Sequence, residues 1–144
     1  MRYALYPGCS LEQSAEAYAV SAQRVAETLG VQLQAIEDWN CCGSHEYFSI
    51  EALPAYALVA RNLALVGDDF GEVVAPCSAC YVNLMKTNKN MGKYPELGRQ
   101  VNEALAAGGL HYVPNRLRVR HLLDVFVNDV GDETIKSAVT RPLK

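Results

Sequence analysis

Five cysteines are the residues of this chain whose types and spacing could do chemistry. They form three groups: Cys9 alone, the adjacent pair Cys41-Cys42, and Cys77 with Cys80. Adjacent cysteines make a strained disulfide, because their Cα atoms lie about 3.8 Å apart whereas bridged ones usually lie about 4.4–6.8 Å apart. An odd number of thiols also excludes complete pairing within the chain. The pattern therefore indicates thiolates collected for metal binding or redox chemistry.

The composition is that of one soluble domain in a reducing compartment. Half of the 144 residues are apolar, which is enough for a substantial core, and the net charge of −3 argues against nucleic-acid binding. No apolar run approaches the roughly 20 residues that a membrane span needs, and the N-terminus lacks the apolar core of a secretory signal. We therefore expect a cytoplasmic protein without membrane insertion, in which the cysteines are ligands or redox groups.

Short strands alternate with helices along the chain. The strands are expected at 2–6, 31–37 and 72–76, and the second alternates apolar and polar residues as an edge strand does. The helices are expected at 10–30, 51–67, 78–91 and 94–109. Residues 116–131 are expected to start extended and to become helical around His121. Strands separated by helices predict an α/β fold with an open, mostly parallel sheet and helices on both faces.

Each cysteine group follows one of the expected strands. In an open α/β sheet, the loops at the carboxyl ends of parallel strands gather at one edge, where such folds bind ligands. The three groups are therefore expected to converge on one site, although they are distant in sequence. Gly8 and Gly43 flank the cysteines and would let the backbone approach an inorganic centre closely.

Three kinds of site compete for these thiols. A structural zinc site usually takes four ligands in two short-spaced pairs, and only one C-x₂-C pair is present. A thioredoxin-like dithiol would use Cys77 and Cys80 and leave the other three cysteines without a role. An iron–sulfur cluster takes soft thiolates and can use adjacent cysteines on different irons. The residues favour the cluster, with a zinc module and a dithiol oxidoreductase as the alternatives.

Other side chains near the cysteines have ordinary explanations. His45 could bind a metal or pass protons to a reduced sulfur, but a solvated loop histidine is the favoured interpretation because five thiols suffice for a cluster. Trp39 and Tyr47 bracket the cysteine pair and are expected to pack in the core. Arg120 belongs to an alternation of arginine and apolar residues that is typical of the solvent side of a strand.

The stretches YPGCSLE, DWNCCG and APCSACY resemble the cysteine-rich CCG domain, and most closely that of the B subunit of heterodisulfide reductase. The resemblance covers residues 1–130 and leaves 131–144 as a C-terminal tail or linker. It implies that an unusual noncubane [4Fe–4S] cluster is held by Cys9, Cys41, Cys42, Cys77 and Cys80. It names no catalytic side chain. A sample prepared in air is expected to lose the cluster or to hold zinc in its place.

The resemblance also implies an activity and partners. Heterodisulfide reductase B subunits carry two such domains, whose paired clusters flank a disulfide and deliver one electron to each sulfur. The chain is therefore expected to receive electrons from an iron–sulfur donor subunit and to pass them toward a small-molecule disulfide or thiol substrate. Only one copy of the motif is present, so a second CCG domain is expected in a missing C-terminal half or in another chain. The isolated chain is expected to be inactive.

Overall fold

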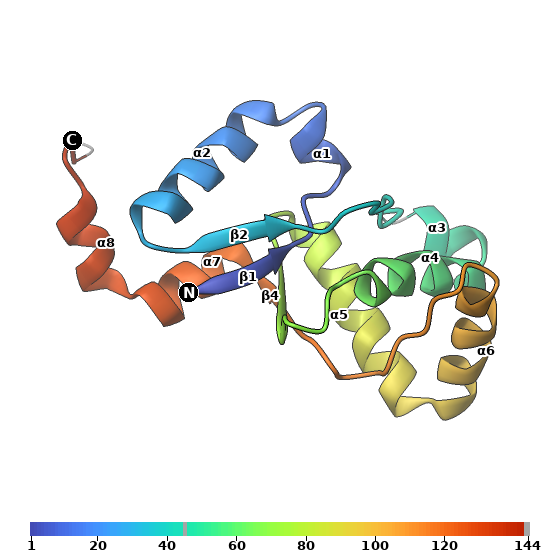
Figure 1. Ribbon diagram of the computed structural model, residues 1–144. Coiled ribbons are helices and arrows are strands. Elements are labelled where there is room, and N and C mark those ends of the chain that lie inside the picture. The colour runs from blue at the N-terminus through green and yellow to red at the C-terminus, as the bar shows by residue number, and fades with distance from the viewer. Residues whose placement is uncertain (45, 143–144) are drawn as a thin grey trace.

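A computed structural model describes residues 1–44 and 46–142 and shows one four-stranded sheet. Its strands are β1 (Arg2–Leu5), β2 (Gln32–Ala35), β3 (Glu72–Ala75) and β4 (Arg118–His121). The order is β2-β1-β3-β4, and all three pairings are parallel (Figure 1). The predicted open, parallel α/β sheet is confirmed, and β2 lies at an edge as its alternating residues indicated.

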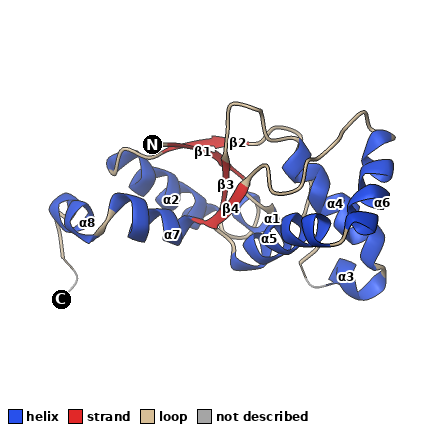
Figure 2. Ribbon diagram, turned by 90° about the horizontal axis from the view of Figure 1, so that it is seen from below, coloured by secondary structure: helices blue, strands red, loops and turns tan. Residues whose placement is uncertain are grey.

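Helices cover both faces of the sheet. They are α1 (Cys9–Glu12), α2 (Glu16–Thr28), α3 (Glu46–Ile50), α4 (Ala52–Ala64), α5 (Ser78–Lys93), α6 (Pro95–Ala106), α7 (Leu122–Val125) and α8 (Asp132–Ala138), with a π-helical turn at Phe126–Val130. Helices α4, α5 and α6 pack on one face, and α2 and α7 pack on the other (Figure 2). None of the helices in the described part of the chain has the length and apolar character that a membrane crossing requires.

The two central strands supply both cores. Successive strand residues point to opposite sides of a sheet. Ala4 and Val73 accordingly face the larger core under α4, α5 and α6, whereas Tyr3 and Val74 face the smaller core under α2 and α7. Because helices cover both faces of these strands, the carboxyl edge of the sheet is where loops can present functional side chains.

The helix expected over 10–30 is broken into α1 and α2. The backbone N–H groups of Ser14 and Ala15 both donate to the carbonyl of Ser10, at 3.1 and 2.7 Å, and close a turn between the two helices. The break leaves Cys9 in a short helix of its own. At the other end of the chain, β4 passes into α7 directly after His121, as expected. Helix α8 buries none of its residues, and the domain boundary at residue 130 stays a prediction.

Arg120 on β4 is buried, so the expectation that it faces solvent is wrong. Its side chain is only 3% exposed and forms ion pairs with Glu72, Asp124 and Asp129. The distance from its Nη2 atom to Asp129 Oδ1 is 2.9 Å. The alternating pattern did not reveal this contact set, because Glu72 lies on the neighbouring strand and is distant in sequence.

The same ion pairs make stability depend on pH. Hydrogen bonds from Arg120 and Tyr3 lower the pKa of Asp129 from 3.8 to about 2. Because the folded-state pKa is the lower one, this carboxylate stabilises the fold above about pH 5 and loses its effect as pH falls from about 4 to about 2. We expect Asp129→Asn to lower the free energy of unfolding at pH 7 by about 1 kcal/mol, since the side chain is partly exposed.

Urea unfolding of the wild type and the variant between pH 2 and 7 measures this effect. The loss of stability between about pH 4 and pH 2 should be smaller in Asp129→Asn than in the wild type. The matched control is Asp132→Asn on the exposed helix α8, which should keep the wild-type profile. A profile of Asp129→Asn that coincides with the wild type would contradict the assignment.

Candidate metal centre

The carboxyl ends of β1, β2 and β3 lie at one edge of the sheet (Figure 1), and the five cysteines follow these three strands in the sequence. Cys9 begins α1 after β1, and the Cys41-Cys42 pair lies in the loop after β2. Cys77 caps α5 after β3, and Cys80 stands in the first turn of that helix. In the structure, each cysteine group therefore follows the same strand that it follows in the sequence prediction.

The sulfur atoms meet in close pairs. The Sγ atoms of Cys9 and Cys41 are 3.5 Å apart, and those of Cys42 and Cys80 are 3.4 Å apart. The peptide bond between Cys41 and Cys42 joins the two pairs, and the side chain of Cys77 interacts with that of Cys80. The structure therefore brings together all five of the cysteines that the sequence singled out. Their role as ligands stays a prediction.

The site is buried on one side and open on the other. Cys42 and Cys80 are 2% and 4% exposed, Cys41 and Cys77 are half-buried, and Cys9 is exposed. A group held by all five would be covered by the core on the side of Cys42 and reachable from solvent on the side of Cys9.

Asparagines on two helices hold the loop that carries the cysteine pair. Asn62 of α4 is fully buried; its Nδ2 donates to the carbonyl of Asn40 at 3.0 Å, and its Oδ1 accepts from the N–H of Asn40 at 2.9 Å. Asn83 of α5 donates to the carbonyls of Cys42 and Ser44, at 3.1 and 2.6 Å. The sequence patterns did not point to either residue. For Asn62 a signal was available, because it is a polar residue on the otherwise apolar buried face of α4, whereas the buried face of α5 also carries Thr87 and Asn88.

Aromatic residues close the buried side of the site. The Tyr6 hydroxyl donates to the carbonyl of Asn40 at 2.8 Å, and the rings of Tyr6 and Trp39 meet edge to face with centroids 5.5 Å apart. Burial, with the nearby thiols adding, raises the pKa of Tyr6, so it remains a donor. Trp39 packs against the core as expected, whereas Tyr47 is 38% exposed and that expectation is wrong. His45 lies outside the described residues.

The thiols of the site differ in acidity. The pKa of Cys42 is lowered to about 6, chiefly by the hydrogen bond with Cys80, and the same bond together with burial raises the pKa of Cys80. Burial also raises the pKa of Cys41, although the Gly43 N–H donates to its Sγ at 3.4 Å. The hydrogen bond between Cys42 and Cys80 thus favours the thiolate form of Cys42 over that of Cys80. Further deprotonation needs a cation that offsets the repulsion among the sulfurs.

Two glycines let the backbone pack closely around the thiols. A Cβ added at Gly8 would lie 3.0 Å from the Sγ of Cys80, and one at Gly43 would lie 2.0 Å from Cδ2 of Tyr47. Both glycines have positive φ, of 78° and 75°, which other residues rarely adopt. A side chain at position 8 would crowd the Cys80 sulfur, and one at position 43 would collide with the Tyr47 ring, so both positions require glycine.

The spacing of the sulfurs also suits a metal centre. Two thiolates bound to one tetrahedral metal at about 2.3 Å lie about 3.8 Å apart. Each close pair would thus need to open by only a few tenths of an ångström. Within 1–44 and 46–142, no three Cys, His, Asp or Glu side chains already stand where they could hold a metal ion. Soft thiolates nevertheless match iron and zinc, and the residues fit a thiolate-bound centre.

Known proteins similar to this chain match nearly all of it. The 8-methylmenaquinol:fumarate reductase membrane anchor subunit of Wolinella succinogenes is 33% identical, and the alignment covers 98% of this chain and 48% of that protein. A protein of Archaeoglobus profundus named as similar to the B subunit of heterodisulfide reductase is 31% identical, with 96% and 46% covered. The B subunit of the ferredoxin/F(420)H(2)-dependent CoB-CoM heterodisulfide reductase of Methanosarcina acetivorans is 24% identical, with 99% and 47% covered. The chain spans about half the length of these curated relatives.

A solved structure shares the fold. The crystal structure of a hypothetical protein from Helicobacter pylori superposes with a TM-score of 0.71 at 20% identity, over 84% of this chain and 24% of that one. The family model described as the cysteine-rich domain CCG matches residues 3–85, which is more than half of the chain and includes all five cysteines. As the sequence motifs predicted, the chain therefore belongs to the family of cysteine-rich CCG domains, with relatives among the B subunits of heterodisulfide reductase.

Proposed function

We propose that this chain binds an iron–sulfur cluster and transfers electrons within a heterodisulfide-reductase-like oxidoreductase. The observation that carries the proposal is the meeting of five thiols from three separate loops at one edge of the sheet, with sulfur pairs at 3.4 and 3.5 Å. The names of the similar B subunits support the same class of reaction. The proposed ligands are Cys9, Cys41, Cys42, Cys77 and Cys80.

The proposal assigns roles to residues of this chain. A bound cluster of the noncubane [4Fe–4S] type would supply one-electron oxidation and reduction. Tyr6 and Trp39 exclude water from the buried side of the site, and Asn62 and Asn83 fix the loop that presents the cysteine pair. The exposed side around Cys9 leaves access for an electron donor and for the compound that is reduced.

The proposed substrate is a small-molecule disulfide or the corresponding thiols. The proposed partners are an iron–sulfur electron-donor subunit and a second CCG domain, since the relatives are about twice as long as this chain. One domain supplies half of a two-electron reduction if each sulfur of a disulfide receives one electron. The complete activity is therefore expected only from the assembled complex.

Iron and acid-labile sulfide per chain, measured after strictly anaerobic purification, test the proposal. We expect about four irons with matching sulfide and an EPR signal from the oxidised protein. About one zinc and no iron would contradict the proposal and favour a structural zinc module. Absence of both metals from a sample co-expressed with its partner would favour a dithiol oxidoreductase that uses Cys77 and Cys80.

A further inference from the structure

A groove lined by lysines lies along α5, beside the cysteine site. Its volume is about 510 Å³, and it is bounded by α5 on one side and by α3 and the first turns of α4 on the other. The residues that decide its character are apolar Phe48, Tyr56 and Met85 together with Lys86, Lys89 and Lys93. The rings of Phe48 and Tyr56 pack edge to face with centroids 4.9 Å apart and make one firm wall.

The three lysines form a row. Spacings of three and four residues place Lys86, Lys89 and Lys93 on one face of α5. At 1.5 Å per residue, the row extends about 10 Å along the helix axis. All three side chains belong to exposed residues, and Lys93 Nζ lies 5.1 Å from the ring centroid of Tyr94. The groove thus presents positive charge along its length and not at a single point.

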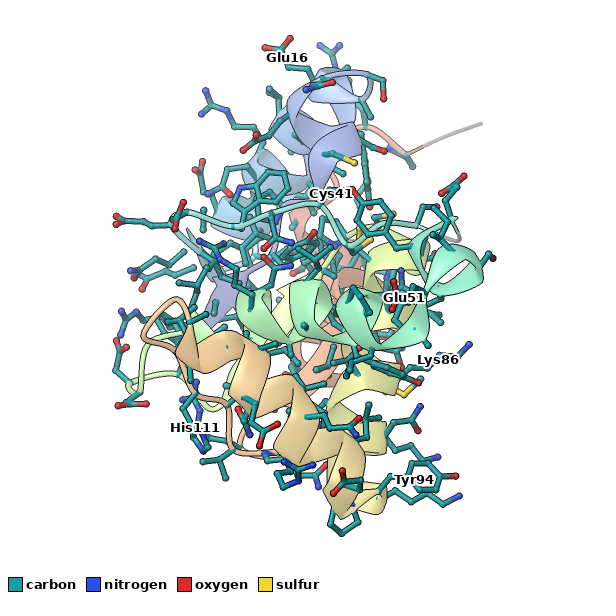
Figure 3. The ribbon with its side chains drawn as sticks, turned by 90° about the vertical axis from the view of Figure 1, so that its right-hand side faces the viewer. Glu16, Cys41, Glu51, Lys86, Tyr94 and His111 are labelled. Carbon is teal, nitrogen blue, oxygen red and sulfur yellow. The ribbon has the colours of Figure 1, made fainter. Side chains whose placement is uncertain are left out.

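These lysines differ in their partners from Lys136 and from the arginines up to Arg120. Every arginine from Arg2 to Arg120 forms an ion pair with a carboxylate. In the part of the chain that the structure describes, no ion pair joins Lys86, Lys89 or Lys93 to a carboxylate. Glu51 lies on the same side of the molecule as Lys86 and reduces the local positive charge (Figure 3).

One end of the groove is the cysteine loop. Ser44, two residues after Cys42, lines the groove, and so does Asn83, whose side-chain amide donates to the carbonyls of both residues. In Figure 3 the labelled residues Cys41, Glu51, Lys86 and Tyr94 follow one another from top to bottom of the molecule. A ligand that filled the groove would therefore lie against the loop that presents the cysteine pair.

We propose that this groove is the docking surface for an acidic segment of a partner polypeptide. A single phosphate or carboxylate is too small to reach all three lysines, whereas carboxylates spaced along a peptide match a row of about 10 Å. The apolar surfaces of Phe48 and Tyr56 on one side of the groove and of Met85 on the other suit the apolar side chains that stand between such carboxylates. The inference goes beyond the proposed function and needs no cluster. If the cluster is present, the docked partner lies beside it.

A labelled peptide of about twelve residues, with glutamate at every third or fourth position and leucines between, is the probe. Its binding to the full chain is followed by fluorescence anisotropy under anaerobic conditions at low and high salt. The test variant is Lys86→Glu/Lys89→Glu/Lys93→Glu. The matched control is Arg24→Glu/Lys136→Glu/Arg141→Glu, which changes the net charge equally at exposed positions outside the groove. Lys86→Gln/Lys89→Gln/Lys93→Gln repeats the test without charge reversal if the first variant unfolds.

We expect the groove variant to bind the peptide at least about tenfold more weakly than wild type, the control to stay within about twofold, and salt to weaken binding. An equal loss in both variants overturns the proposal, as does absence of binding by the wild type. Tripolyphosphate or a DNA oligonucleotide that binds as tightly as the peptide also overturns it. Iron content is measured in parallel. If the groove variant binds the peptide more weakly and keeps its iron, the result supports the groove independently of the cluster. If the wild type binds the peptide but contains no iron, the result contradicts the proposed function and leaves the groove proposal standing.

Discussion

The Cys9→Ser variant is expected to lose most of the iron and labile sulfide that the wild-type chain binds, to below about a quarter of the wild-type content. Cys9 Sγ lies 3.5 Å from Cys41 Sγ, so the substitution replaces one member of a close sulfur pair. A serine hydroxyl is a hard donor that does not ionise near neutral pH, and it holds iron poorly in place of a thiolate. Because Cys9 is exposed, the substitution leaves both cores intact.

The matched control for this variant is Ala79→Ser. It adds a hydroxyl within the Cys77–Cys80 segment but removes no thiolate, and it should keep the wild-type iron content. The pair of variants also separates the cluster from the dithiol alternative. A dithiol enzyme keeps both of its sulfurs in Cys9→Ser, so an unchanged metal content with unchanged thiol–disulfide exchange would contradict the proposed function.

The Gly43→Ala variant is expected to destabilise the fold by about 3 kcal/mol. A Cβ at this position would lie 2.0, 2.2 and 2.7 Å from Cδ2, Cγ and Cβ of Tyr47. Rotation of the tyrosine ring cannot relieve a contact with its own Cβ, so the backbone of the loop must move. The positive φ of Gly43 adds strain for any residue with a side chain. Urea unfolding measures the loss.

Gly109→Ala is the control that isolates the steric contact. Gly109 has nearly the same φ, 70°, but no atom lies within 4 Å of its added Cβ, so we expect a loss of only about 1 kcal/mol. The double variant Gly43→Ala/Tyr47→Ala removes the two ring contacts but keeps the contact with the Cβ of residue 47 at 2.7 Å, so it should recover only part of the difference between the two single variants. Equal losses of stability in Gly43→Ala and Gly109→Ala would show that the loop backbone moves at little cost. That result would contradict the rigid loop that the asparagine hydrogen bonds indicate.

Local sequence patterns were sufficient to predict the sheet and the meeting of the thiols. Each cysteine group follows a short strand, apolar at β1 and β3 and alternating at β2, so parallel pairing alone brings the thiols to one edge. The edge position of β2 could also be predicted, because alternation of apolar and polar residues is typical of a strand with one face exposed to solvent.

What the sequence did not reveal depends on contacts between distant residues. Arg120 is buried only because Glu72 and Asp129 meet it there, and Asn83 reaches a loop 41 residues earlier in the chain. In the turn after α1, the carbonyl of Ser10 accepts hydrogen bonds from two backbone N–H groups, and the spacing of apolar residues does not predict such a turn. The lysine row on α5 has the spacing of an ordinary solvated face. It becomes part of a groove only through the opposing wall of α3 and α4.

The strand order has a consequence for where any ligand of this fold can sit. From β1 the chain crosses to β2 through α2 on one face, and from β3 it continues into α5 on the other. The two adjacent strands therefore send their connections in opposite directions and form a topological switch point, where their ends part and leave a crevice. Cys9 follows one of these strands and Cys77 the other. The right-handed crossovers therefore place the thiol site at this switch point, whatever residues the loops contain.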